Sequence, residues 1–203
     1  MSRKFFIGIV ALMITAFLVV PSMAKNPKGE VVAKGPKDKV VEKGPSGQAG
    51  KSNIAHLYLY EKTSEGTVEG EDWPIVEGGM WGKMKYNLSG FTFDFVFNGH
   101  KLPIGVEYTL IYYPDPWPAE GLICLGSGVV IESEDGSGNI HIKNSVDTGN
   151  LPIESDDNFS EGAKIFLVPT EHVDCENQKM VGWAEDANLY EGALITFDYP
   201  DDE

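Results

Sequence analysis

The chain has 203 residues, 42% of them hydrophobic, and a formal net charge of −15 at pH 7. The negative charge is carried by residues 53–203, which contain seven lysines and 28 acidic residues. Because proteins bind nucleic acid phosphates with clustered Lys and Arg, this composition excludes nucleic acid as a partner.

Residues 1–24 are predicted to be a secretory signal peptide. A positively charged start precedes an apolar run over residues 5–20, and the small residues Ser22 and Ala24 occupy the third and first positions before the expected cut. The apolar run is short for a membrane span, which needs roughly 20 apolar residues. We therefore expect a secreted or cell-surface protein, with membrane attachment only if the segment stays uncleaved.

Residues 25–52 form a low-complexity segment rich in Lys, Gly, Pro, Val and Ala, which lacks the apolar content needed to order itself. Its seven lysines and three acidic residues give it a net charge of +4. The composition predicts either a solvated, disordered linker or an arm that touches an anionic envelope polymer or lipid surface.

Residues 53–203 are long enough for a single domain with its own core. Phe91, Phe93, Phe95 and Phe97 recur at every second position, which is the periodicity of a strand with one buried face. Short apolar runs between Gly, Pro, Asn and Asp turns predict an all-β, antiparallel, immunoglobulin-like β-sandwich of about seven to nine strands. The expected strands are 54–61, 79–86, 91–98, 107–113, 121–131, 139–146, 163–168, 179–183 and 193–199.

Residues 134–139, EDGSGN, predict a hairpin loop because these turn residues separate two β-branched runs. Cys124 and Cys175 are expected to form a disulfide, since an even cysteine count in an exported protein favours pairing over two buried free thiols. Trp81 and Trp183, which each lie beside a glycine, are expected to pack in the core.

The sequence lacks the residue patterns of the common copper and zinc sites and of a serine nucleophile. No histidine follows Cys175, so the usual order of Cys, His and Met in a blue-copper site is broken. His172 and Cys175 have a zinc-like spacing, but the chain offers too few further ligands. Ser127 has glycines directly beside it, whereas a nucleophile elbow needs them two residues away. No cofactor is therefore expected, with calcium as the one ion left to consider.

Two acidic turns have the oxygen-rich side chains that calcium binds. Asp135 and Asn139 occupy the first and fifth positions of a loop that begins like a calcium loop but lacks the later Gly and Glu of an EF-hand. A second acidic turn contains Asp156 and Asp157. These four residues are the candidate ligands of a surface calcium ion.

The loop over residues 112–118, YYPDPWP, is the main candidate for binding. Its prolines fix the backbone, so Tyr113, Asp115 and Trp117 are predicted to be held rigidly toward a sugar ring or a protein partner. The alternative is a loop that folds over the open end of the sandwich and covers its core.

Five stretches within residues 53–203 are similar to a known group of proteins. They are GGMWGK at 78–83, YNLSG at 86–90, FVFNGH at 95–100, YTLIYYPDPW at 108–117 and DCENQKMVGW at 174–183. With these motifs the chain resembles, from about His56 to Asp198, a group of exported β-sandwich proteins of methanogenic archaea and some bacteria to which no activity is assigned. A looser similarity to immunoglobulin-like modules rests on Leu102, Gly105, Tyr108 and Leu110. Both resemblances imply an architecture, and neither implies an activity.

These features favour an exported binding or structural module without enzymatic activity, whose partner is a protein or glycan at the cell surface or in the medium. The alternative is a small extracytoplasmic hydrolase that uses two carboxylates, with or without calcium. Sequons begin at Asn87 and Asn158, so an exported chain has two potential sites for attached glycans.

Overall fold

The structure, a computed structural model, describes residues 52–65, 67 and 72–200, so the predicted signal peptide and nearly all of the predicted linker lie outside the described residues. Every pairing between named strands is antiparallel. The helical segments are two short 3-10 turns, Thr170–His172 and Glu185–Ala187. The predicted all-β, antiparallel fold is confirmed, and no helix in this part of the chain has the length and apolar character that a membrane crossing needs.

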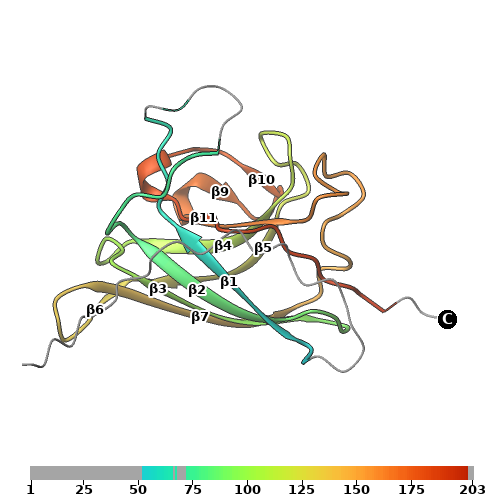
Figure 1. The fold of residues 1–203 in the computed structure, drawn as a ribbon, viewed down its shortest axis with the longest axis horizontal. Helices are drawn as coiled ribbons and strands as arrows, with labels where there is room; N and C mark the ends of the chain where they lie inside the picture. Colours follow the sequence, from blue (N-terminus) through green and yellow to red (C-terminus); the bar gives the residue numbers. More distant parts are fainter. Residues whose placement is uncertain (1–51, 66, 68–71, 201–203) are drawn as a thin grey trace, which may run out of the picture. The chain divides into compact units, whose positions relative to one another are not determined.

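One sheet has six strands in the order β11, β1, β2, β3, β7, β6 (Figure 1). The first three strands of the chain follow one another as a meander, and β7 then pairs with the free side of β3. The strands are β1 Ile54–Tyr60, β2 Trp81–Asn87, β3 Phe93–His100, β6 Ile131–Glu132, β7 Gly138–Val146 and β11 Tyr190–Glu191.

The second sheet has three strands in the order β5, β4, β8. They are β4 Glu107–Tyr113, β5 Ile123–Val129 and β8 Lys164–Pro169. A separate two-stranded hairpin, β9 Val173–Asp174 with β10 Lys179–Met180, lies above β4 and β5 in Figure 1.

The main core lies between the two sheets, which is consistent with the predicted β-sandwich. Phe93, Phe95 and Phe97 of β3 are buried, whereas Asp94 and Asn98 at the alternate positions are exposed. The same alternation along the neighbouring strands adds Leu57, Leu59, Met84, Tyr86, Ile140 and Ile142 to this core. The period of two in the sequence therefore marks which face of the six-stranded sheet is buried.

Strand β4 is buried on both faces, and every residue from Tyr108 to Tyr113 is buried. Its inward side chains join the main core, while Ile111 and Tyr113 join a second cluster with Phe166 and Val168 of β8. The β9–β10 hairpin contributes to the cover of this second cluster. A strand buried on both sides has a continuous apolar run rather than alternation, as seen in this segment.

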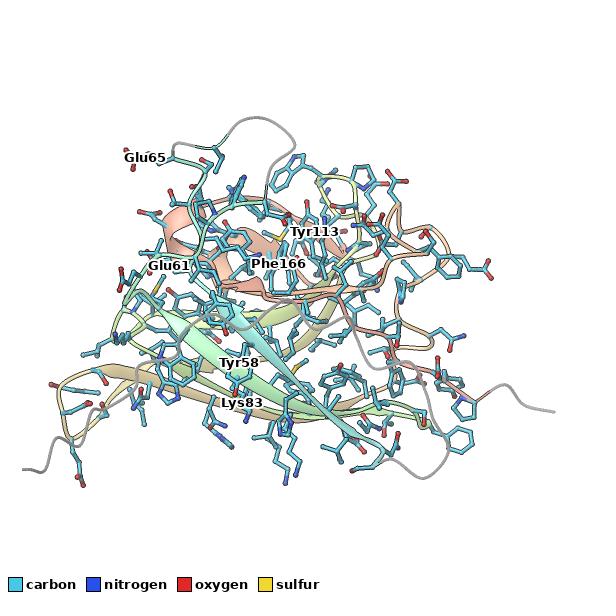
Figure 2. All side chains as sticks on the ribbon, in the orientation of Figure 1. Tyr58, Glu61, Glu65, Lys83, Tyr113 and Phe166 are labelled. Carbon is cyan, nitrogen blue, oxygen red and sulfur yellow. A yellow bond between two sulfur atoms is a disulfide. The ribbon has the colours of Figure 1, made fainter. Side chains whose placement is uncertain are left out.

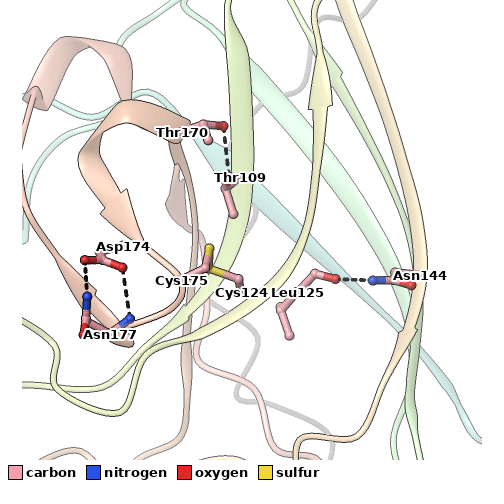
Figure 3. The surroundings of a disulfide bond; sticks show 8 residues. All are labelled: Thr109, Cys124, Leu125, Asn144, Thr170, Asp174, Cys175 and Asn177. Atoms are coloured by element: carbon pink, nitrogen blue, oxygen red, sulfur yellow. Dashed lines mark hydrogen bonds between the residues drawn. A yellow bond between two sulfur atoms is a disulfide. The ribbon is translucent and has the colours of Figure 1, made fainter.

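Cys124 of β5 forms a disulfide with Cys175 in the turn between β9 and β10, as predicted, with a Cα–Cα distance of 5.8 Å. Figure 3 shows this bond near a second link, in which Asn144 Nδ2 of β7 donates a hydrogen bond of 2.7 Å to Leu125 O of β5. The disulfide ties the hairpin to the three-stranded sheet, and Asn144 ties the two sheets together at one edge.

Several expected strands have different limits in the structure, among them the one expected over residues 179–183, which ends at Met180. Phe91 is 64% exposed and lies before β3, where it meets Tyr199 edge to face, so the buried alternation begins only at Phe93. The expected strand 121–131 is divided at Val130, because β5 pairs with β4 whereas β6 pairs with β7. The predicted hairpin loop follows directly and is confirmed by the pairing of β6 with β7.

The expected strand 193–199 is present only as isolated bridges. Ile195 pairs with Ala163, and Phe197 pairs with Leu151, so alternate residues bond to different segments instead of one partner strand. The immunoglobulin-like strand order is not confirmed. The third strand of a constant-type immunoglobulin domain lies in the opposite sheet, whereas β3 here is a neighbour of β2.

Candidate aromatic binding site

Six aromatic side chains, which we name the aromatic cluster, gather on the outer face of the three-stranded sheet. They are Trp73, Tyr113, Trp117, Phe166, Trp183 and Tyr190. Tyr113 pairs with Lys164 across β4 and β8, and Phe166 lies two residues after Lys164, so these three side chains share one face of the sheet. In Figure 2, Tyr113 and Phe166 lie on the side of the molecule opposite Tyr58 and Lys83.

Trp183 is at the centre of the aromatic cluster. Its ring centroid lies 5.7 Å from that of Tyr190, 6.0 Å from that of Trp117 and 6.2 Å from those of both Tyr113 and Phe166. The rings meet edge to face or tilted, which aromatic pairs favour because ring edges are positive and ring faces negative. Trp183 still keeps 38% of its surface exposed, so its neighbours fix the indole while part of it stays accessible.

Two pockets adjoin Trp183, and both use Tyr113 and Trp183 as walls. The first, of about 300 Å³, is completed by Trp117. The second, of about 290 Å³, contains charged side chains as well, namely Lys62, Asp72, Asp115, Lys164 and Glu191. Both are shallow and open to solvent, and their volumes lie at the lower end of the roughly 300–1,000 Å³ typical of ligand pockets, so each offers a surface for one ring-sized group.

Asp115 and Lys164 form an ion pair within the second pocket. Lys164 Nζ and Asn158 Nδ2 both donate to Asp115 Oδ2. The pair joins the loop after β4 to the start of β8 and so fixes the loop on the sheet. The two side chains are 25% and 26% exposed, which leaves both within reach of a ligand.

Glu191 contributes an unusual carboxyl group to the same pocket. Burial raises its pKa to about 7, against smaller opposing effects from Lys62, a backbone hydrogen bond and Lys164. Its Oε2 is buried and has no hydrogen-bond partner among the residues that the structure describes. Buried polar atoms without a partner are uncommon, so this carboxyl group marks Glu191 as a candidate functional residue.

The three predicted binding residues all line these pockets, but their environments differ. Tyr113 is only 6% exposed, and burial, with a smaller effect of Asp115, raises its pKa to about 12. Trp117 is 53% exposed. Each of the two interpretations of the loop therefore describes one part of it, because Tyr113 covers the second core while Trp117 faces solvent.

Reasoning from sequence does not find Trp73, Trp183 or Glu191. Trp183 is expected in the core because Gly182 precedes it, but that glycine serves a close contact with His172, whose ring carbon would lie 2.7 Å from an added Cβ. No pattern in the chain links these residues to the loop at 112–118, since only tertiary packing brings them together.

Trp81 also departs from the expected core position. It lies on the outward face of the six-stranded sheet, where its ring centroid is 4.5 Å from that of His100. The glycine beside it, Gly82, is the residue that faces the core, because an added Cβ there would lie 2.2 Å from Phe97.

In the first acidic turn, expected to bind calcium, the candidate ligands are hydrogen-bonded to other protein groups. Asp135 accepts hydrogen bonds from the hydroxyls of Ser133 and Ser137 and from the Ser137 amide, which lower its pKa to about 2. Asn139 Oδ1 contacts His100 Nδ1 at 3.0 Å. The two candidate ligands of this turn therefore point to different partners.

The second acidic turn has a structural role. Asp156 is 3% exposed and accepts hydrogen bonds from the Tyr112 hydroxyl at 2.6 Å, the Asn158 amide at 2.9 Å and the Asp115 amide at 3.2 Å, whereas Asp157 is exposed. Within residues 52–65, 67 and 72–200, no group of three or more His, Cys, Asp or Glu side chains is arranged to hold a metal ion. The expected calcium ion has no such ligand set in this part of the chain.

Comparison of the chain with protein-family models, with curated proteins and with solved structures found no match. The function is therefore argued from the chemistry of the site itself.

Proposed function

We propose that the protein is an exported carbohydrate-binding module whose site is the aromatic cluster with its two pockets. The Cys124–Cys175 disulfide supports the proposal, because it is compatible with an oxidising compartment outside the cytosol. The proposed ligand is a glycan at the cell surface or in the medium. We also propose that the chain is a member of the group of exported archaeal and bacterial proteins that it resembles.

One observation carries the proposal: Trp183 is a firmly held but accessible indole that forms a wall of two adjoining, ring-sized pockets. A sugar ring has apolar C–H faces and a polar rim of hydroxyl groups. Its face stacks on an indole, while its hydroxyls bond to the charged groups of the second pocket, Asp115, Lys164 and Glu191. Two pockets that share a wall suit two consecutive sugar units.

A glycan array with the mature protein, followed by calorimetric titration of the best ligand, tests the proposal. Trp183→Ala is expected to lower the affinity for that ligand by about tenfold or more, since a buried aromatic contact is typically worth over about 1.4 kcal/mol. Trp81→Ala is the matched control, because it removes a partly exposed indole from the opposite sheet.

The controls separate binding from stability. Trp183→Ala is compared with the natural protein by circular dichroism, and Trp183→Phe, which keeps an aromatic face, is expected to retain more affinity than the alanine variant. An equal loss in Trp81→Ala, or glycan binding that survives Trp183→Ala in a folded protein, would show that the aromatic cluster is not the site.

A second candidate function, glycoside hydrolysis, is favoured by a separate observation. Glu191, with a pKa raised to about 7, shares its pocket with Asp115, which is paired with Lys164. A carboxyl group that keeps its proton beside a second carboxylate is the arrangement that many glycosidases use. Hydrolysis would be established if the protein cleaves a bound glycan and Glu191→Gln abolishes the cleavage but retains the affinity. A ligand that stays intact after prolonged incubation would show that the protein binds the glycan without cleaving it.

A further inference from the structure

The outward face of the six-stranded sheet carries two rows of side chains, all polar except one valine, which we name the basic sheet face. One row runs through Tyr58, Lys83, Asn98 and His141, and the next through His56, Lys85, Val96 and Lys143. Each residue lies directly opposite its neighbour on the adjacent strand, so both rows cross β1, β2, β3 and β7. The result is an ordered array on regular strands rather than on loops.

These side chains point away from the core because the alternate residues fill it. Leu57, Met84, Phe97 and Ile142 lie between them along the four strands and are at most 3% exposed. Figure 2 shows Tyr58 and Lys83 on the side of the sheet that faces away from the second sheet. In the basic sheet face, Tyr58 is 41% exposed.

The charge of this face is opposite to that of the rest of the domain. Lys83, Lys85 and Lys143 are three of only seven lysines in residues 53–203, which contain 28 acidic residues. Asp94 is the one acidic residue within β1, β2, β3 and β7, and it is bonded to Ser145 and Thr92. The pKa of His56 is lowered by partial burial and then by the positive charge of Lys83 and Lys85.

A groove of about 560 Å³ crosses the same face and has a lysine from each of two strands in its lining. Its outward lining includes Lys85 of β2, Asp94 and Val96 of β3 and Lys143 and Ser145 of β7. Asp94 is the one carboxylate among them, and it accepts hydrogen bonds from the hydroxyls of Thr92 and Ser145. Strands lie about 4.8 Å apart, so Lys85 and Lys143 are separated by about 10 Å across the groove, while Lys83 and Lys85 are about 7 Å apart along β2. The backbone positions of these lysines are thus spaced both along one strand and across the sheet.

The other side chains of the face are suited to a sugar polymer. Lys83 Nζ lies 5.3 Å from the ring centroid of Tyr58, which itself stacks on Tyr60 at 13°. Asn98 Oδ1 contacts His141 Nδ1 at 2.8 Å, which orients its amide nitrogen away from that contact. The ammonium groups of the face complement carboxylates, its aromatic ring complements sugar C–H faces, and its amide complements hydroxyls. A carboxylated sugar polymer offers all three.

We propose that the basic sheet face binds a linear, carboxylated polysaccharide. This site is separate from the aromatic cluster on the opposite side and does not depend on the function proposed for it. At about 0.15 M salt the Debye length is about 8 Å, so the acidic residues of the other sheet are screened from a polymer lying on this face. The contacts at the face itself then decide whether the polymer binds.

The test measures binding of the mature protein to immobilised polygalacturonate, with neutral dextran as the reference polymer. The double variant Lys85→Gln, Lys143→Gln is expected to raise Kd about tenfold or more, and binding of the natural protein is expected to weaken as salt rises to about 0.5 M. Lys101→Gln, Lys179→Gln is the matched control, because it changes the net charge equally at exposed sites outside the face.

Three results would overturn the proposal. An equal rise in Kd for both double variants would mean that only net charge matters. Polyphosphate bound as tightly as polygalacturonate would mean that the face selects charge and not a polysaccharide. The third result is salt-sensitive self-association in sedimentation that the Lys85→Gln, Lys143→Gln variant loses, with no binding to polygalacturonate. It would mean that the face binds a second copy of the chain.

Discussion

The indole of Trp117 meets the indole of Trp183 edge to face, with ring centroids 6.0 Å apart and an interplanar angle of 89°. Trp117 belongs to the loop after β4, whereas Trp183 follows the disulfide-linked hairpin nearer the end of the chain. Their contact makes one surface from two segments that are distant in sequence. The loop at 112–118 is therefore one wall of the candidate site and not the whole of it.

Trp117→Ala is expected to leave the fold intact and to weaken glycan binding. Because Trp117 is 53% exposed, its removal should change the free energy of unfolding by less than about 1 kcal/mol. Phe166→Ala, in the buried part of the same cluster, should cost about 3 to 5 kcal/mol. Urea denaturation followed by circular dichroism measures both, and an unfolded Trp117→Ala protein would show that the loop serves the core only.

Glu191 is expected to make the folded protein less stable as pH rises. Its pKa is about 7 in the folded protein against 4.5 for an ordinary Glu, so between these values the folded state holds a proton that the unfolded state has released. The free energy of unfolding therefore falls as pH rises through this interval, by about 3 kcal/mol from this one group.

The variant Glu191→Gln cannot ionise and is expected to lose that part of the pH dependence. It should be more stable than the natural protein at about pH 8 and similar to it below about pH 3.5, where Glu191 is protonated in both states. Urea denaturation at a series of pH values measures the difference. Parallel pH profiles for the two proteins would mean that Glu191 is not a buried acid.

The fold was predictable where local patterns decide it. The alternating phenylalanines of β3 predict a half-buried strand, and the apolar run from Tyr108 to Tyr113 predicts β4. The division at Val130 and the bridges of residues 193–199 were not predictable, because a strand that changes sheets and one that bonds to several segments have no periodic signature.

The candidate site was predictable only in part. The prolines around Trp117 mark that loop as rigid, but Trp183 and Glu191 reach it through tertiary packing that leaves no spacing pattern. The sequence predicts Asp156 as a surface calcium ligand, because an acidic turn has the same composition whether its carboxylate is solvated or buried. Only its bond to the Tyr112 hydroxyl reveals the structural role.

Asp156→Ala is expected to destabilise the protein by about 3 kcal/mol, because it leaves the buried Tyr112 hydroxyl and two backbone amides without their acceptor. The matched control is Asp157→Ala at the exposed neighbouring position, with an expected change below about 0.5 kcal/mol. Thermal denaturation with and without calcium measures both variants. A rise in melting temperature with calcium that Asp156→Asn removes would contradict the structural role and restore the metal site.

Reduction of the Cys124–Cys175 disulfide is expected to lower both stability and glycan affinity. The bond closes a loop with a sequence separation of 51, which corresponds to about 4 kcal/mol in the chain-entropy model. It also holds the β9–β10 hairpin on β5, and Trp183 lies three residues after that hairpin ends at Met180. The double variant Cys124→Ser, Cys175→Ser should therefore unfold at lower urea concentration and, where still folded, bind the glycan more weakly than the oxidised protein. Titration of folded samples separates the two effects, and two alkylatable thiols in the unreduced natural protein would rule out the bond.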